Sequence, residues 1–426
     1  MSLRVVHCVG FYFPDQVGGT EVYVRDLAAA LVDHGIESSI IAATDGAPRE
    51  YSWEGVPVFR YPAKSDRTYF QKLVGGLKPD LFHLHSWTTG AGLEHLRGVA
   101  ELGIPSVVTV HVPAAICIRG TALLEGRTAC DGRIDERRCA YCWAEGRGLP
   151  APAARLLSHL PKWTPPAWTA RSPVRRIATL ASARAMAANQ AARLHEIAGL
   201  CGRIVVPSRW MHAALLANAI PAGKLLLSGQ AAGEAFERGT RPRRGEDGLR
   251  IGFVGRLDAY KGAQTLVEAV LQIPAETRLR LIVAGTTDDL KNLRLIERAA
   301  QRDPRIELVG ALSHDRIPAF LDGLDILAVP SHCQETGPIV VLEAHAMGVP
   351  VMGSDLGGIA ERIRDGVDGW LLPFDDPRAW AAAMREAAAD PAEVARRAAN
   401  SLRTRSAGDI AAEMASLYGE LAVKSK

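Results

Sequence analysis

The chain has 426 residues, of which 48% are hydrophobic and 23% are charged. This is ordinary globular usage, so the composition excludes large-scale disorder, and the length is that of two or three domains. The net charge of +3 is too small for a nucleic-acid-binding domain, so we expect no nucleic-acid partner. No apolar stretch approaches the length of about 18 residues that spans a membrane, and the first ten residues lack a signal-peptide pattern. We therefore expect a cytoplasmic protein.

Strands alternate with helices in the first part of the chain. Apolar runs rich in β-branched residues are separated by segments with helical spacing, and glycines mark the ends. This alternation predicts βαβ units and a parallel sheet with helices on both faces. The expected elements are strands at 4–10, 37–43, 81–85 and 106–111, and helices at 21–34 and 92–102.

Residues 112–176 break this alternation because they are rich in Cys, Arg, Pro and Trp, and we interpret them as an insertion. An Ala-rich helix is expected over 175–200 and a strand over 203–207. The polar, glycine-containing stretch 228–248, with the basic run Arg241–Arg244, is the best candidate for a linker.

Alternation resumes in the second part of the chain. The expected elements are strands at 251–254, 280–284, 326–330 and 350–353, and closing helices at 380–402 and 410–421. The sequence thus predicts an α/β protein with two doubly wound, Rossmann-like domains that face each other across a cleft. The predicted boundaries are 1–227 for the first domain, 228–408 for the second, and 409–426 for a last helix that returns to the first.

Several familiar nucleotide and hydrolase signatures are absent from the sequence. There is no GxxxxGK[ST] phosphate loop, no GxGxxG, no GxSxG and no HExxH. Their absence argues against P-loop NTPases, dinucleotide oxidoreductases, serine hydrolases with that motif and zincins.

Two cations follow the first strand of the second domain. Arg256 and Lys261 follow within six residues of Gly255, where the strand ends and a helix is about to begin. A guanidinium fork and an ammonium beside the N–H groups of a helix start form a site suited to a diphosphate. Two solvated surface cations are the alternative interpretation.

Two glutamates flank the start of another helix in the same domain. Glu335 follows the strand at 326–330, Pro338 suits the first helical position, and Glu343 lies about a turn and a half into the helix. A carboxylate at Glu343 could accept two hydrogen bonds from a ribose diol. Two unrelated glutamates at this spacing are also common in helical proteins.

Together these residues resemble the GT-B glycosyltransferases of family 4, also called the group 1 glycosyl transferases. The resemblance spans nearly the whole chain and is strongest from 249 to 400. Its motifs there are Val254-Gly255-Arg256-Leu257, Lys261-Gly262, Glu335-x7-Glu343, Gly357-Gly358-Ile359-Ala360-Glu361 and Asp365-Gly366-x-x-Gly369. In the first domain it is weaker and rests on Gly18-Gly19-Thr20-Glu21, His83-Leu84-His85 and Thr109-Val110-His111.

The resemblance implies a GT-B fold and transfer of a sugar, of the hexosyltransferase type, from a nucleotide-sugar donor to an acceptor hydroxyl. It implies retention of anomeric configuration and no cofactor or catalytic metal. The implied setting is bacterial polysaccharide, lipopolysaccharide or glycolipid synthesis, with a glycan or lipid-linked acceptor. A nucleotide-sugar epimerase of the same fold, and a non-catalytic nucleotide-sugar-binding protein, are the alternatives.

The resemblance also implies roles for the matching positions. Arg256 and Lys261 would hold the donor diphosphate, Glu335 would contact the donor sugar, and Glu343 would hold the ribose. The implied catalytic residues are His111, Arg256, Lys261 and Glu335, and the implied donor-binding residues are Gly18, Gly19, Gly255, Pro338, Ile339, Val340 and Glu343.

Backbone groups have implied roles as well. Pro338 has no N–H, so Ile339 and Val340 would present theirs to phosphate. His111 is expected to end a strand and face the sugar, and Gly18-Gly19 would let the backbone approach donor and acceptor. One stretch departs from the family, because 227–233 lacks the usual Asn-Gly-Val-Asp-type turn, and contacts made there are not carried over.

Four of the seven cysteines fall within the insertion. Cys117, Cys130, Cys139 and Cys142 have the spacing C-x12-C-x8-C-x2-C, and disulfides are uncommon in the cytoplasm. A four-cysteine set that ends in C-x2-C predicts structural zinc, with an iron–sulfur centre or unligated thiols as alternatives.

The same segment holds the chain's basic excess, because 111–176 carries 11 basic and 5 acidic residues. Basic residues that include Arg171 are interspersed there with the apolar residues Leu156, Leu157, Leu160, Trp163 and Trp168. Such a composition can bind a protein to a surface of anionic lipid. We expect peripheral contact with the inner face of the membrane, with a core-packing helix as the alternative.

Two histidines alternate on one expected strand. His83 and His85 are two residues apart, so both side chains face the same side of the sheet near its carboxyl end. Core histidines are the ordinary interpretation of such a pair.

Overall fold

The structure is a computed structural model that describes residues 2–15, 18–85, 90–165, 175–233, 235–236, 248–402 and 404–424. It divides into two compact units, one formed by Met1–Gly229 with Ala407–Lys426 and the other by Gln230–Ser406. Most of the predicted linker, including Arg241–Arg244, lies outside the described residues.

The first unit is built on an eight-stranded sheet with the order β10-β9-β6-β5-β1-β2-β4-β3. All neighbours are parallel except β3 and β4. The strands are β1 (Leu3–Val9), β2 (Ile36–Thr44), β3 (Arg49–Trp53), β4 (Val56–Pro62), β5 (Leu81–His85), β6 (Ser106–Thr109), β9 (Arg203–Val206) and β10 (Leu225–Leu227). Strands β5 and β6 are buried along their whole length, as strands of a parallel sheet covered on both faces are.

The sequence prediction missed the hairpin of β3 and β4. The two strands are joined by Glu54 and Gly55, which have φ angles of 48° and 85°. A two-residue loop in which both φ angles are positive matches the right-handed twist of antiparallel strands. The hairpin makes β3 the last strand at one edge of the sheet.

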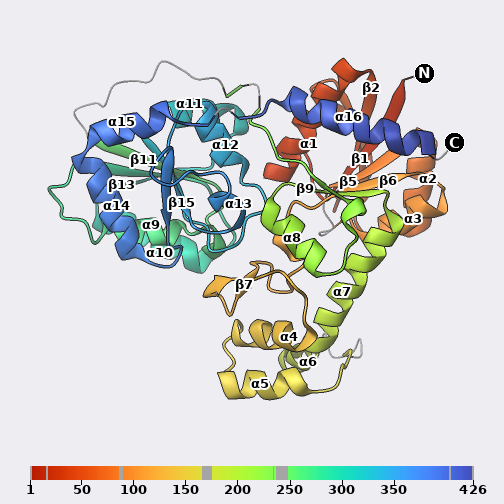
Figure 1. The fold of residues 1–426 in the computed structure, drawn as a ribbon, viewed down its shortest axis with the longest axis horizontal. Helices are drawn as coiled ribbons and strands as arrows, with labels where there is room; N and C mark the ends of the chain where they lie inside the picture. The colour runs from red at the N-terminus through yellow and green to blue at the C-terminus, as the bar shows by residue number, and fades with distance from the viewer. Residues whose placement is uncertain are drawn as a thin grey trace. The chain divides into compact units, whose positions relative to one another are not determined.

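Helices cover both faces of this sheet. They are α1 (Gly19–Ala30), the 3-10 turn η1 (Leu31–His34), α2 (Arg67–Leu77), α3 (Leu93–Glu101), α7 (Ala183–Leu200), α8 (Arg209–Ala217) and α16 (Ala407–Lys424). Helix α16, drawn in blue at the end of the chain, lies against α1, η1 and β5 (Figure 1). Its Tyr418 is fully buried, so the last helix is part of the core of the first unit.

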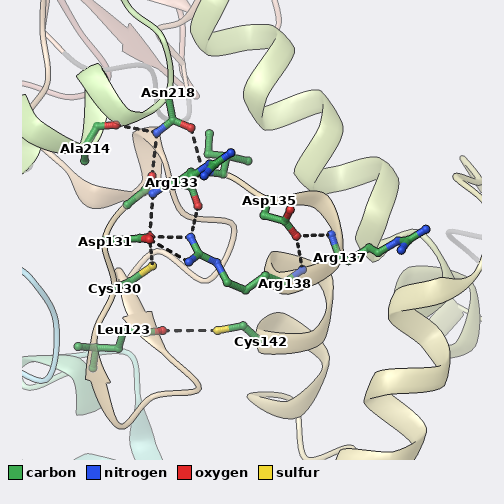
Figure 2. A network of polar contacts seen from close by, with 12 residues as sticks. Leu123, Cys130, Asp131, Arg133, Asp135, Arg137, Arg138, Cys142, Ala214 and Asn218 are labelled. Atoms are coloured by element: carbon green, nitrogen blue, oxygen red, sulfur yellow. Dashed lines mark hydrogen bonds and ion pairs between the residues drawn. The ribbon is translucent and has the colours of Figure 1, made fainter.

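The insertion has its own small fold beside α7. It contains the strands β7 (Leu123–Leu124) and β8 (Thr128–Ala129) and the helices α4 (Glu136–Glu145), α5 (Ala151–His159) and α6 (Arg175–Ala181). Trp143 is the largest buried side chain there and packs with Ala140, Ala154 and Ala183 of α7. Asn218, just after α8, accepts a hydrogen bond from Ile134 N and donates one to Gly132 O, both at 2.8 Å (Figure 2).

The single helix predicted over 175–200 is wrong, because the structure has two helices that meet at Ser182. The Ser182 hydroxyl donates to the carbonyl of Thr179 at 2.7 Å. A serine that bonds back to its own helix competes with the backbone pattern and bends the helix at that point.

The second unit is a six-stranded, all-parallel sheet with the order β13-β12-β11-β14-β15-β16. In chain order this is 3-2-1-4-5-6, the doubly wound arrangement. Its strands are β11 (Leu249–Val254), β12 (Leu279–Ala284), β13 (Ile306–Gly310), β14 (Ile326–Val329), β15 (Val351–Ser354) and β16 (Gly369–Leu372). The predicted α/β class with two Rossmann-like halves is confirmed.

The helices of the second unit are α9 (Ala263–Val270), α10 (Leu290–Arg302), α11 (Ile317–Asp322), α12 (Ile339–Ala346), α13 (Gly357–Ala360), α14 (Pro377–Ala389) and α15 (Pro391–Ala399). The single helix predicted over 380–402 is wrong, because Asp390 separates α14 from α15. Asp390 caps the new helix by accepting from Glu393 N, and the missing N–H of Pro391 costs nothing in the first turn.

Among the described residues, no helix combines the length and the apolar character needed to cross a membrane. The strand order places the switch point of the second sheet between β11 and β14. Ligands of doubly wound sheets bind beside the carboxyl ends of the strands at that point.

Candidate functional site

Two loops meet at the switch point of the second sheet, one after β11 and one after β14. His332 N donates to Tyr260 O at 2.7 Å and joins the loops through their backbones. Gly262 has a φ of 80°, and a Cβ there would lie 1.8 Å from Pro330 O. Only glycine fits both conditions, so this residue fixes how closely the two loops approach.

An ion pair joins the same two loops. Lys261 Nζ donates to Glu335 Oε1 at 2.7 Å, and Ser331 Oγ donates to the same oxygen at 2.9 Å. The side chains are 30% and 15% exposed. The structure therefore brings together two residues that the sequence placed 74 positions apart.

The pKa values of the pair move in opposite directions. Burial by itself would lower the pKa of Lys261 and raise that of Glu335. The attraction between the two charges and the hydrogen bonds to them together outweigh burial, so the pKa of Lys261 is raised and that of Glu335 is lowered. Both groups are therefore charged at neutral pH.

Arg256 lies beside this pair and is more exposed. Its side chain is 61% exposed, Nη2 is 2.8 Å from Asp258 Oδ2, and the guanidinium lies 5.4 Å from the centre of the Tyr260 ring. Each of the two predicted diphosphate-binding cations thus has a carboxylate beside it. The site is a set of oriented ion pairs, not a pocket of uncompensated positive charge.

Helix α12 begins beside the Glu335 loop. The prediction that Pro338 is the first helical residue is wrong by one position, because Pro338 is the N-cap and the helix begins at Ile339. Ile339 and Val340 are the first two helical residues, whose N–H groups have no acceptor within the helix. Glu343 is only 4% exposed on the same helix.

A glycine pair supports the Glu335 loop from the other side. Gly358 N donates to Glu335 O at 2.7 Å, and a Cβ on Gly358 would lie only 2.7 Å from that oxygen. The Gly357-Gly358 motif of the resemblance therefore positions Glu335 through backbone contact.

Two neighbours of this loop were missed by the sequence prediction. A Cβ on Gly337 would lie 1.9 Å from Gln230 Oε1 and 3.1 Å from Arg362 Nη2. Arg362 is 9% exposed, and burial lowers its pKa to about 10. The only sequence signal for Arg362 is that it directly follows the motif that ends at Glu361. Gln230 had no such signal, because it lies in the stretch where the chain departs from the family.

The remaining candidate residues lie in the first unit. Gly18 is the N-cap of α1 and Gly19 its first residue. His111 does not end a strand as predicted, because β6 ends at Thr109 and His111 follows two residues later. His111 is 9% exposed, its Nε2 lies 3.3 Å from His85 Nδ1, and burial lowers its pKa to about 3.

A buried arginine supports the segment that leads toward Gly18. Arg60 of β4 donates to Tyr12 O at 2.8 Å and to Ala43 O at 3.1 Å, and it forms an ion pair with Asp15. Its side chain is 1% exposed. Nothing in the spacing of the sequence signalled this role.

The four cysteines of the insertion line one cavity of about 20 Å³. Cys142 Sγ accepts a hydrogen bond from Glu125 N at 3.1 Å and donates to Leu123 O at 3.5 Å, as Figure 2 shows for the second contact. Burial raises the pKa of Cys130, and it raises that of Cys139 to about 12.

The sulfur atoms do not converge to metal-binding distances. Within the part of the chain that the structure describes, the only set of three or more His, Cys, Asp or Glu ligand atoms within 4.8 Å of one another is that of His7, His83 and His85. The cavity offers four thiols and room for one ion, and the zinc site stays a prediction.

The basic stretch after the cysteines exposes apolar side chains. Leu156 of α5 and Ile177 of α6 are each 70% exposed, and Leu160 and Trp163 are each 41% exposed. Lys162 forms an ion pair with Glu136 at 2.5 Å. Trp168 and Arg171, which belong to the same prediction, lie outside the described residues.

Two doubly wound units of this kind, with charged loops at the switch point of the second sheet, define the GT-B class of α/β proteins. Residues 17–226 match the family described as Glycosyltransferase Family 4, and residues 248–390 match that described as Glycosyl transferases group 1. The chain therefore belongs to the family 4, or group 1, glycosyltransferases, as its motifs predicted.

Individual relatives agree with this assignment. A D-inositol 3-phosphate glycosyltransferase of Paenarthrobacter aurescens is 26% identical over 406 residues, which is 87% of this chain and 84% of the relative. Sucrose-phosphate synthase from Thermosynechococcus elongatus has a TM-score of 0.67 at 20% identity and covers 99% of this chain and 100% of its own. HepE of Anabaena, solved with UDP-glucose, has a TM-score of 0.61 at 16% identity, with 100% and 99% covered. The two solved structures support the fold.

The Lys261–Glu335 pair predicts a pH-dependent stability difference. The lowered pKa of Glu335 means that its contribution is complete above the ordinary value of 4.5 and is lost as pH falls through the folded value. Glu335→Gln should therefore lower the free energy of unfolding by roughly 1–3 kcal/mol at pH 7, and the difference should shrink toward zero in acid. Urea unfolding of both proteins across this range measures it.

Glu276→Gln is the control, because Glu276 is exposed in the turn before β12. Its stability difference from the wild type should stay small at every pH. A Glu335→Gln difference that is unchanged at acid pH would show that the ion pair is not its cause.

Proposed function

We propose that this protein is a retaining glycosyltransferase that moves a sugar from a nucleotide-sugar donor to an acceptor hydroxyl without a catalytic metal. The observation that carries the proposal is the Lys261–Glu335 pair at the switch point, with Arg256 beside it. These groups lie where a doubly wound sheet binds its ligand.

The charged groups suit a departing diphosphate. Within the described residues Lys261 Nζ has one hydrogen-bond acceptor, Glu335, while an ammonium carries three donors. The exposed guanidinium of Arg256 and the N–H groups of Ile339 and Val340 supply further donors. Such preoriented donors at the leaving group are each worth roughly 10²–10³ in rate.

Positive charge develops on the sugar as its bond to the diphosphate breaks, and the leaving phosphate takes the negative charge. The leaving phosphate can itself accept the proton of the acceptor hydroxyl, so the reaction requires no second carboxylate across the bond. Glu335 then contacts the donor sugar and Glu343 holds the ribose. His111 faces the sugar. Gly18, Gly19 and Gly255 have no side chain, so the substrate can approach the backbone closely there.

The comparisons suggest which substrates to try first. HepE was solved with UDP-glucose and the Paenarthrobacter relative is named for an inositol phosphate acceptor, so uridine-linked hexoses and phosphorylated or lipid-linked polyols head the list. The broader setting that we propose is bacterial polysaccharide, lipopolysaccharide or glycolipid synthesis on the cytoplasmic side. Transfer to an acceptor separates this function from that of an epimerase or a non-catalytic binder.

Lys261→Ala should lower kcat/KM for sugar transfer by at least about tenfold, because it removes a donor to the leaving diphosphate. Arg256→Lys should also lower it, because an ammonium cannot reproduce the bidentate fork. Steady-state transfer assays measure both effects, with the thermal unfolding midpoint as a check on folding.

Lys291→Ala is the matched control, since Lys291 is an exposed lysine on α10 of the same unit. It should leave kcat/KM unchanged. A fully active Lys261→Ala enzyme would remove Lys261 from the mechanism.

We also propose that the cysteine cavity holds one structural zinc ion. Four thiols line one small cavity that suits a single ion. Because the sulfur atoms do not converge in the structure, binding requires their side chains to rotate and, with pKa values raised, to release protons.

Metal analysis of the purified protein should find about one zinc per chain, lost in Cys139→Ser with a drop in thermal stability. Cys201→Ser, which changes a buried cysteine of the sheet core, should keep the metal. A folded wild-type protein without metal would contradict the proposal.

We further propose that the insertion touches an anionic membrane surface through Leu156, Leu160, Trp163 and Ile177. Their exposed apolar side chains, with the arginines around them, combine the two features that hold a protein at a lipid surface.

Leu156→Glu should reduce flotation with vesicles of anionic lipid. Val32→Glu, which changes an exposed valine of η1, should not; no flotation of the wild type would refute the contact.

A further inference from the structure

Four histidines lie close together in the core of the first unit. His7 lies on β1, His83 and His85 lie on β5, and His111 follows β6. The first three are fully buried, and His111 is 9% exposed. His7 and His83 are partners in the strand register, so their side chains lie on the same face of the sheet.

Three of these rings are linked by hydrogen bonds that start at Ser38. His7 Nε2 lies 3.3 Å from Ser38 Oγ, His7 Nδ1 lies 3.0 Å from His85 Nε2, and His85 Nδ1 lies 3.3 Å from His111 Nε2. We call Ser38, His7, His85 and His111 the imidazole row. The row runs from Ser38 on β2 to His111, the residue that the family resemblance implies faces the sugar.

His83 stands beside the row but outside it. Its Nδ1 contacts the hydroxyl of Tyr418 at 2.6 Å, and its Nε2 contacts Thr109 Oγ1 at 2.7 Å. It therefore ties the last helix to the sheet. The ring of His83 is centred 3.8 Å from that of His85 and is equally buried.

The rings of the row are neutral, since burial lowers the pKa of each histidine, to about 3 for His7 and His111. A neutral imidazole donates from one nitrogen and accepts at the other. If His7 donates to His85, then His85 donates to His111, and the proton of His111 sits on Nδ1. If the direction reverses, it sits on Nε2. No ring can change its tautomer alone without leaving a buried group of the row without a complementary partner.

A metal ion bound by His7, His83 and His85 is the competing interpretation, because their nitrogens lie within 4.8 Å of one another. In the structure, however, both ring nitrogens of His7 and of His83 already have partners. A metal would have to displace contacts with Ser38, Thr109 or Tyr418. The hydrogen bonds are complete without it.

We propose that His85 and His7 are positioning residues that fix the ring orientation and the tautomer of His111. The inference rests on the proposed function, in which His111 faces the donor sugar. A sugar hydroxyl can pair with either a donor or an acceptor nitrogen. The direction of the hydrogen bonds along the row therefore decides which of the two His111 offers.

His85→Phe tests the row because it keeps a planar aromatic ring at this position and removes both nitrogens. It should lower kcat by roughly 10- to 100-fold while KM for the donor changes less than about threefold. His83→Phe is the matched control, as an equally buried imidazole of the same strand that is outside the row. It should reduce stability and leave kcat within about threefold of the wild type. His85→Asn, whose amide can still reach His111, should restore part of the loss.

Nitrogen NMR of histidine-labelled protein gives a readout that does not depend on activity. The wild type should show one tautomer at His111, and His85→Phe should show a mixture. If His85→Phe does not fold, Ser38→Ala removes only the end of the row and should change the tautomer populations of His7. An unchanged His111 signal and an unchanged kcat in these variants would overturn the proposal, as would a stoichiometric transition metal lost in His7→Phe.

Failure of the proposed function looks different. In that case the wild type transfers no sugar from any nucleotide donor, while the tautomer change at His111 is still observed by NMR.

Discussion

The ion pair between Lys261 and Glu335 is the interaction on which the candidate site depends. It joins two loops that leave neighbouring strands. The Ser331 hydroxyl donates to the Glu335 carboxylate, and the Gly358 N–H donates to the Glu335 backbone carbonyl. Gly262 lets the loops approach to backbone contact, which brings Lys261 within hydrogen-bond distance of Glu335. The parallel sheet supplies the remaining condition, since its strands deliver both loops to one edge.

The charges at this edge are compensated in the structure. Glu335 accompanies Lys261 and Asp258 accompanies Arg256, so both cations are held in defined orientations by short contacts. For the proposed reaction, this arrangement avoids the cost of gathering uncompensated positive charge in a partly buried place. A diphosphate would then meet donors whose directions are already set, which is the condition under which electrostatic stabilisation of a leaving group is most effective.

Buried polar groups play a similar part in the first unit. Arg60 orients the segment before Gly18 through carbonyls and Asp15, and the imidazole row leads from Ser38 to His111. In both cases buried polar groups are held in place by hydrogen bonds inside the core. The candidate site of the second unit is oriented by ion pairs, and the first unit combines a partly buried ion pair with a row of neutral rings.

The sequence by itself determined the α/β class, most strands and the residues at the ends of the strands in the second sheet. Hydrophobic runs between helical segments are local patterns, and the motifs around Lys261 and Glu335 are compact enough to be recognised in the chain. The prediction missed the β3–β4 hairpin, the breaks at Ser182 and Asp390, and the start of α12 at Ile339, because these depend on turn geometry and capping at single residues. Only the tertiary structure decided that Lys261 pairs with Glu335, that Arg362 and Gln230 border Gly337, and that His7 and His85 lead to His111. Those contacts join residues far apart in the chain, and a sequence records which side chains exist but not which of them the packed strands bring within a hydrogen bond of one another.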